Sequence, residues 1–135
     1  MRTFQKTSVF PALSVEDNVL TGLHLRGTAG FLGVLAGRQR LLAEERALAA
    51  DAAVLVEFVG LTRRRREAAG GLPYGEQRLV ELAVALAARP RVLLLDEPGA
   101  GMTGAEKSVV SGLIRRVRDQ GVTVLLVEHD MRMVM

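Results

Sequence analysis

The chain has 135 residues, 49% of them hydrophobic and 24% charged, and it contains no cysteine. This length is typical of one domain with a core of its own, whereas the lack of cysteine excludes disulfides and thiolate metal sites. A formal net charge of +3 is too small to predict a nucleic-acid partner.

The apolar stretches are too short for a transmembrane segment. The longest, 79–88 and 122–127, fall well below the roughly 20 residues that a membrane-spanning helix needs. Residues 1–6 carry basic side chains, but no apolar run of the secretory type follows them. The sequence therefore predicts no span and no signal peptide, and it begins as though already inside a domain.

The first half of the chain is predicted to be helical. Ser14 and Asp17 form an S-x-x-D capping pattern, which places a helix start near Val15. Residues 27–37 are apolar and interrupted by glycines, and they predict a loop with a short helical turn. Residues 38–59 have apolar side chains near helical spacing and predict an amphipathic helix.

A basic run and a further helix follow. The four arginines at 63–66 are interpreted as a solvated helix end and not as a lipid or nucleic-acid patch. Residues 74–88 predict a helix that begins at Tyr74 or Gly75 and is stopped by Pro90.

The last third of the chain has an α/β pattern. Residues 92–95 form a continuous apolar run that predicts a buried parallel strand. A helix is predicted at 106–119, and the apolar, β-branched run 122–127 predicts a second strand. The three segments together predict a βαβ unit.

Three groups of residues in this part could carry chemistry. Asp96 and Glu97 follow the first strand, and hydrolysis of a phosphate needs one carboxylate for Mg²⁺ and another for the attacking water. Two solvated acids at a strand end explain the same pair equally well. Gly75 opens a helix, where an anion can bind, although a simple turn is the alternative. His129 follows the second strand and could donate to a phosphate oxygen or be structural.

Taken together, these residues resemble the ATP-binding cassette ATPases. Gln5, the runs 72–77 and 93–98 and His129 match in order the Q-loop, the signature motif, the Walker B strand and the switch histidine. The Tyr-Gly-x-Gln-Arg form of the signature, the insertion at 30–37 and the closing residues 128–135 resemble the branched-chain amino-acid importer subunits in particular.

The resemblance implies a fold and a division of the chain. The fold class is α/β, a partial P-loop NTPase-like parallel sheet core with an α-helical subdomain. Residues 1–10 would be a remnant of the ATPase core with the Q-loop, and 11–88 the helical subdomain with the signature. Residues 89–135 would be a partial α/β core with the Walker B strand and the switch histidine.

The resemblance also implies the role of each site residue. Asp96 would hold Mg²⁺ through water, Glu97 would act as general base, His129 would contact the γ-phosphate, and Gln5 would sense Mg²⁺ or water. ATP bound to the opposite subunit of a head-to-tail dimer would be covered by the signature residues Tyr74, Gly75, Glu76 and Gln77. The D-loop at the dimer seam would be formed by Gly99, Ala100, Gly101 and Met102.

The function implied is an ATP-hydrolysing subunit of an importer, with ATP and Mg²⁺ as ligands. Its partners would be transmembrane permease subunits, a second ATPase subunit and, indirectly, a solute-binding protein, on the cytoplasmic face of the membrane. The alternatives are a cassette ATPase that works on ribosomes or DNA, and an inactive or regulatory remnant. The transported solute does not follow from the sequence.

Several features depart from the family pattern. No G-x-x-x-x-G-K-[ST] occurs, and 104–108 is not such a loop because Glu106 stands where its last glycine belongs. Pro73 replaces the usual signature serine, and Val84 replaces a common arginine. We interpret the chain as a truncated reading frame and expect that, alone, it neither binds ATP tightly nor hydrolyses it.

Overall fold

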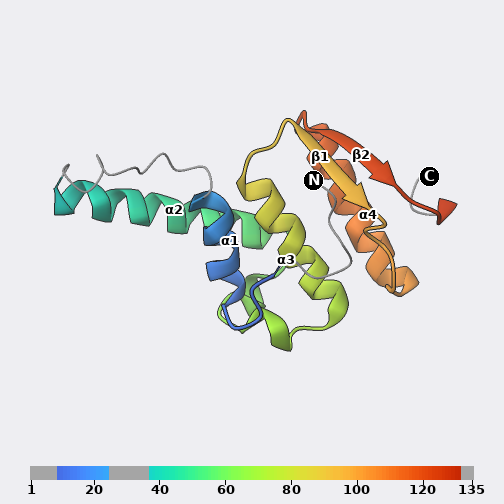
Figure 1. Cartoon of the computed structure of the whole chain (residues 1–135), viewed down its shortest axis with the longest axis horizontal. Helices are drawn as coiled ribbons and strands as arrows, with labels where there is room; N and C mark the ends of the chain where they lie inside the picture. Colours follow the sequence, from blue (N-terminus) through green and yellow to red (C-terminus); the bar gives the residue numbers. More distant parts are fainter. Residues whose placement is uncertain (1–8, 25–36, 132–135) are drawn as a thin grey trace.

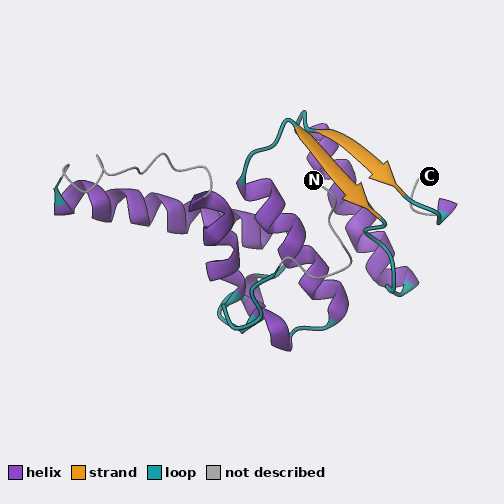
Figure 2. Cartoon of the chain, in the orientation of Figure 1, coloured by secondary structure: helices purple, strands orange, loops and turns teal. Residues whose placement is uncertain are grey.

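The fold combines helices with a two-stranded parallel sheet. The computed structural model describes residues 9–24 and 37–131. In chain order the elements are α1 (Val15–His24), α2 (Arg38–Phe58), η2 (Thr62–Arg64), η3 (Ala69–Gly71), α3 (Tyr74–Ala87), β1 (Val92–Asp96), α4 (Gly104–Asp119) and β2 (Thr123–Val127). Figure 1 shows α1, α2 and α3 gathered on one side and α4 lying along the sheet, and Figure 2 shows the same division by type of element. The predicted mixture of helices and parallel strands is confirmed.

Helices α1 and α3 approach each other closely in the helical half. A β-carbon on Gly22 would come within 2.6 Å of the Val84 backbone oxygen and 2.9 Å of the Ala87 β-carbon. Around this crossing Val15, Val19 and Val80 are fully buried, and each such side chain contributes about 1.5–3 kcal/mol by its removal from water. Of the helices described in 9–24 and 37–131, none has the length and apolar content to cross a bilayer.

Asn18 fixes the segment that leads into α1. It is the buried polar residue at the start of the helix, with no exposed surface. Its amide nitrogen donates to the carbonyl oxygens of Phe10, Leu13 and Ser14 at 3.1, 3.3 and 2.9 Å, and its oxygen accepts from the Phe10 N–H at 2.8 Å. One side chain thus satisfies four backbone groups of a segment that has no regular structure.

The predicted cap of α1 is confirmed, and the start of α1 also contacts the basic run and the residues that follow it. The Ser14 hydroxyl accepts from the Asp17 N–H at 3.1 Å. Arg65 donates from Nε to Glu16 at 2.7 Å, and Ser14 pairs with Ala68 in an isolated antiparallel bridge. The interpretation of the basic run as a solvated helix end is therefore wrong for Arg65, whose side chain ties the run to α1.

Strands β1 and β2 pair in parallel, with Val92 opposite Thr123 and Asp96 opposite Val127. Leu93 points into the core and is 5% exposed, whereas Val92, Leu94 and Leu125 are 60%, 51% and 55% exposed. The prediction of a strand buried on both faces is wrong for the described residues, because α4 covers one face of the pair and none of the described elements covers the other.

Candidate functional site

The site is formed where the two parallel strands end. Because the strands are in register, their carboxyl ends lie side by side, and the Glu97 N–H continues the ladder by donating to the Val127 oxygen at 2.8 Å. His129 follows β2 after one further residue, and its Nε2 lies 3.1 Å from Oε1 of Glu97. The carboxylate and the imidazole that the sequence singled out are thus in direct contact.

The backbone at Glu97 is held in an unusual conformation. Its φ angle is 46°, in the left-handed region that residues with side chains seldom adopt. The turn is closed by the Ala100 N–H, which donates to the Glu97 carbonyl at 3.0 Å. Such local strain is concentrated at functional sites, and Glu97 is the residue whose carboxylate contacts His129.

The pair is open to a ligand. The His129 side chain is 83% exposed and that of Glu97 39%, so either group can exchange its partner for a bound molecule. Asp96, the last residue of β1, is also exposed.

Asp96 suits the coordination of Mg²⁺. This ion is bound in proteins by one or two carboxylates, with substrate phosphates and water as its other ligands. In the described part of the chain no three acidic or histidine side chains converge into a metal site. A single exposed carboxylate at a strand end fits the donor set that such an ion takes from a protein when a phosphate supplies the rest.

An ion pair anchors the loop that carries His129. Lys107 on α4 donates from Nζ to Asp130 Oδ2 at 2.6 Å, and both side chains are about two-thirds or more buried, with exposed fractions of 27% and 31%. The Asp130 N–H donates to Glu128 Oε1 at 3.3 Å. Sequence reasoning missed Lys107, since its partner is 23 residues away and no local pattern joins them.

The start of α3 packs against the start of α4. A β-carbon on Gly75 would overlap the Glu106 carboxylate, so a side chain at this position would have to displace the end of Glu106. The Tyr74 hydroxyl accepts from Arg78 at 3.0 and 2.8 Å. The ring of Tyr74 lies beside Gly101, where a β-carbon would be 3.4 Å away from it. Residues predicted for the signature and for the D-loop are therefore neighbours within the chain.

Glu106 itself belongs to a capping box. Thr103 Oγ1 accepts from the Glu106 N–H at 3.3 Å, and the Glu106 carboxylate accepts from the Thr103 N–H at 2.8 Å. The bond from the Thr103 N–H lowers the pKa of Glu106. The predicted helix start at 106 was two residues late, although the T-x-x-E pattern would have located it.

Two further signature residues have partners in the chain. Gln77 donates from Nε2 to the Leu72 carbonyl at 2.9 Å. Arg64 Nε lies 2.8 Å from Glu76 Oε2, but that oxygen has no partner in hydrogen-bond geometry, so the contact is an ion pair only. Arg64 also bonds to Glu67 at 3.0 Å, which makes it the second arginine of the basic run that is paired and not merely solvated.

Some predicted features lie outside the described residues. These are Gln5, nearly all of the 27–37 loop and the closing residues 132–135. Among the described ones, the structure brings Glu97 to His129 and Tyr74 to Gly101, and it places Asp96 next to the first pair.

Known proteins resemble this chain in sequence. The profile of the ABC transporter family matches residues 2–100. The chain is 39% identical to the high-affinity branched-chain amino acid transport ATP-binding protein BraF of Pseudomonas aeruginosa over 136 residues, which is all of this chain and 53% of BraF. It is 36% identical over 137 residues to LivG of Escherichia coli, the corresponding transport ATP-binding protein, again covering all of this chain and 53% of LivG.

A solved structure supports the same assignment. The ADP conformation of MJ1267, an ATP-binding cassette of an ABC transporter, superposes with a TM-score of 0.76 at 26% identity, over 99% of this chain and 52% of MJ1267. The chain thus spans about half the length of the relatives that it matches. Its sequence match over residues 2–100 and its fold show that the chain belongs to the ABC transporter family, with the α/β fold of the P-loop NTPase cassettes.

Proposed function

We propose that this chain is part of the ATP-hydrolysing subunit of an ABC importer for branched-chain amino acids. The observation that carries the proposal is the contact of Glu97 with His129 at the carboxyl ends of adjacent parallel strands. Brought together there, a carboxylate and an imidazole can handle the water and the phosphate of one hydrolytic reaction. The amino-acid class is supported by the names of BraF and LivG.

In this proposal each side chain has one task. Glu97 accepts the proton of the attacking water, and His129 donates a hydrogen bond to a γ-phosphate oxygen. Asp96 contributes a carboxylate that holds Mg²⁺ through water.

 Mg²⁺ supplies charge neutralisation at the phosphate oxygens when it is bound. Gln5 is proposed to sense Mg²⁺ or water, as its match to the Q-loop implies.

The subunit arrangement is part of the same proposal. The signature residues at the start of α3 act on ATP held by a second ATPase subunit, with the segment 99–102 at the seam between the two. Tyr74 is 43% exposed and therefore accessible to such a partner. The pair would work on the cytoplasmic face of the membrane with permease subunits and, indirectly, a solute-binding protein. We retain the division into 1–10, 11–88 and 89–135 as the proposed domain organisation.

A chimera tests the proposal, because the 135 residues contain no G-x-x-x-x-G-K-[ST]. The portion of BraF that carries this loop is joined to the chain, and phosphate release is measured with ATP and Mg²⁺. We expect the chimera to hydrolyse ATP and the chain alone to be inactive. The substitution Glu97→Gln should lower the rate roughly 10²- to 10⁴-fold, as loss of a general base does.

The matched control is Glu44→Gln, which removes an exposed acid of α2 from the same chimera. Its rate should equal that of the unsubstituted chimera. If a folded chimera that binds ATP loses no more activity with Glu97→Gln than with Glu44→Gln, the assignment of Glu97 is wrong.

A further inference from the structure

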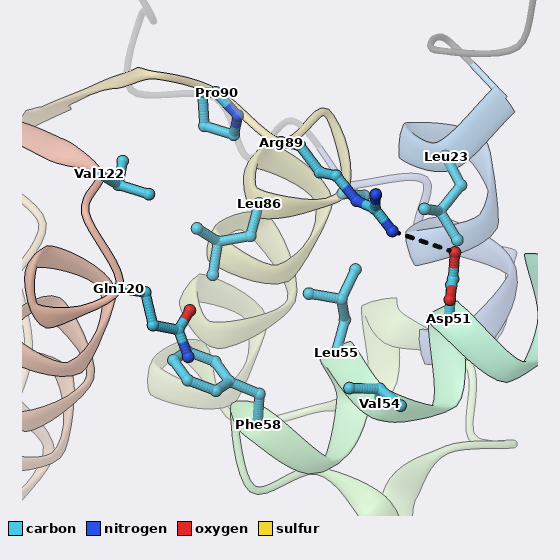
Figure 3. A pocket seen from close by; sticks show the side chains of 11 residues that line it. Leu23, Asp51, Val54, Leu55, Phe58, Leu86, Arg89, Pro90, Gln120 and Val122 are labelled. Carbon is cyan, nitrogen blue, oxygen red and sulfur yellow. Dashed lines mark ion pairs between the residues drawn. The ribbon is translucent and has the colours of Figure 1, made fainter.

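A hollow lies near the ends of the two strands that are opposite to Glu97 and His129. It encloses about 330 Å³ between the helical half and the α/β half of the chain. Its walls are part polar and part apolar, and the apolar side chains come from α1, α2, α3 and the residue before β2, as Figure 3 shows for Leu23, Leu55, Phe58, Leu86 and Val122. A cavity of this size lies at the lower end of the range of about 300–1,000 Å³ for small-molecule sites, which favours a compact ligand.

Two opposite charges stand at the rim of this hollow. Arg89 Nη2 and Asp51 Oδ2 are 3.6 Å apart, and Figure 3 shows the guanidinium directed toward the carboxylate. This distance is too long for a hydrogen bond. The side chains are 66% and 48% exposed, so both retain donors and acceptors for another molecule.

Arg89 has a backbone conformation that normally favours glycine. Its φ angle is 46°. Among the non-glycine residues that the structure describes, only Arg89 and Glu97 have a positive φ. Arg89 follows the last turn of α3 and donates its N–H to the Leu86 carbonyl at 2.8 Å. Glycine is the usual residue at such a helix end because it has no β-carbon to strain. Here the sequence instead has an arginine, whose guanidinium lies at the rim of the hollow.

We propose that this hollow binds a free amino acid with an apolar side chain. The α-carboxylate would pair with Arg89, the α-ammonium with Asp51, and the side chain would enter the apolar walls. A zwitterion has one negative and one positive group, which complement the single arginine and the single aspartate of the rim. A nucleotide does not fit in this way, since it would bring several negative charges to one arginine. The choice of leucine as probe rests on the proposed function, whereas the zwitterionic head rests on the rim charges alone.

The position of the hollow gives such binding a consequence. Asp51 lies on α2, Arg89 just after α3, and Val122 directly before β2, so one ligand would contact both halves of the chain. A molecule that binds one arrangement of the two halves more tightly shifts the population toward it. In this way an amino acid of the imported class would regulate the ATPase subunit by shifting this population.

Titration of the chain with leucine, followed by the NMR signals of its Leu and Val methyl groups, tests the proposal without ATP. We expect shifts at Leu55, Leu86 and Val122 with a roughly millimolar Kd, as suits a ligand of so few atoms. Isocaproate, which lacks the ammonium group, and isoamylamine, which lacks the carboxylate, should each bind roughly tenfold more weakly. Equal binding of isocaproate and leucine would overturn the role of Asp51, and no shift with leucine would overturn the site.

Two variants separate binding from folding. Arg89→Gly removes the guanidinium and relieves the backbone, so it should bind leucine roughly tenfold more weakly while melting at a higher temperature. Asp51→Asn keeps the shape and should weaken leucine binding but not isocaproate binding. Unchanged leucine binding in either folded variant would overturn the proposal. That result would leave the proposed ATPase function standing, because the chimera assay tests that function separately.

Discussion

Gly75 lies so close to the carboxylate of Glu106 that a β-carbon on Gly75 would overlap it, where the first turn of α3 meets the first turn of α4. The same carboxylate accepts the Thr103 N–H and completes the cap of α4. The start of the signature helix and the start of α4 are therefore coupled through one flexible side chain. A side chain at position 75 that displaces the Glu106 carboxylate would therefore weaken the cap of α4.

A double-mutant cycle measures this coupling. Gly75→Ala should lower the melting temperature of the chain, because the new methyl group pushes Glu106 away from Thr103. In the background of Glu106→Ala the same change should raise it, since alanine is a better helix former than glycine. Circular dichroism melts of the four proteins check the prediction, and additive shifts in melting temperature would contradict it.

The cap should also make stability depend on pH. Hydrogen bonds from Thr103 lower the folded-state pKa of Glu106 below its ordinary value of 4.5. A lowered pKa contributes stability that is present above the unfolded value and is lost as the pH falls through the folded one. Urea midpoints of Glu106→Gln should therefore fall below those of the parent chain at pH 7 and converge with them at acidic pH.

Thr103→Ala tests the N-cap hydroxyl of α4 without removing the charge of Glu106. This variant should cost about 1 kcal/mol at neutral pH, as the loss of an N-cap hydroxyl does. A difference between Glu106→Gln and the parent chain that stays constant from neutral to acidic pH would contradict the linkage.

The site at the strand ends was predictable because the sequence pattern that indicates it lies within short segments of the chain. An apolar run of four residues that leads into Asp96 and Glu97, and a second run before His129, indicate two parallel strands whose carboxyl ends meet. The structure brings Glu97 and His129 to 3.1 Å from each other at that edge. Residue pattern and strand direction were sufficient for this contact.

The features that were missed depend on distant partners. Arg65 pairs with Glu16 across 49 residues, and Lys107 with Asp130 across 23. A run of arginines looks the same in the sequence whether its members are solvated or paired. The exposed face of β1 was missed for a related reason, since apolar side chains at Val92 and Leu94 say nothing about which elements cover them.

The crossing of α1 and α3 should tolerate no side chain at Gly22. Gly22→Ala places a methyl group 2.6 Å from a backbone oxygen of α3, which cannot move without the helix. We expect a loss of roughly 1–3 kcal/mol, as for other overpacked cores. Gly112→Ala is the matched control, because that glycine of α4 has open space around it and the substitution should stabilise by about 0.5–1 kcal/mol. Urea denaturation of both variants checks the two signs.

Asn18 should be the most costly polar residue of the helical half to replace. Asn18→Leu keeps the size of the side chain but removes the partner of the Phe10 N–H, whereas the carbonyls of Leu13 and Ser14 keep the N–H groups of Ala69 and Asn18. Each unsatisfied buried group costs about 1–3 kcal/mol, so the variant should lose at least that amount of unfolding free energy.

Thr21→Val supplies the comparison for Asn18, since it deletes a single hydrogen bond, from the Thr21 hydroxyl to the Asn18 carbonyl at 2.6 Å, in the same helix. Its cost should stay near 1 kcal/mol. Hydrogen exchange distinguishes the two, because Asn18→Leu should expose the Phe10 amide while Thr21→Val leaves it protected. Equal protection of that amide in both variants would show that the segment before α1 is held by other contacts.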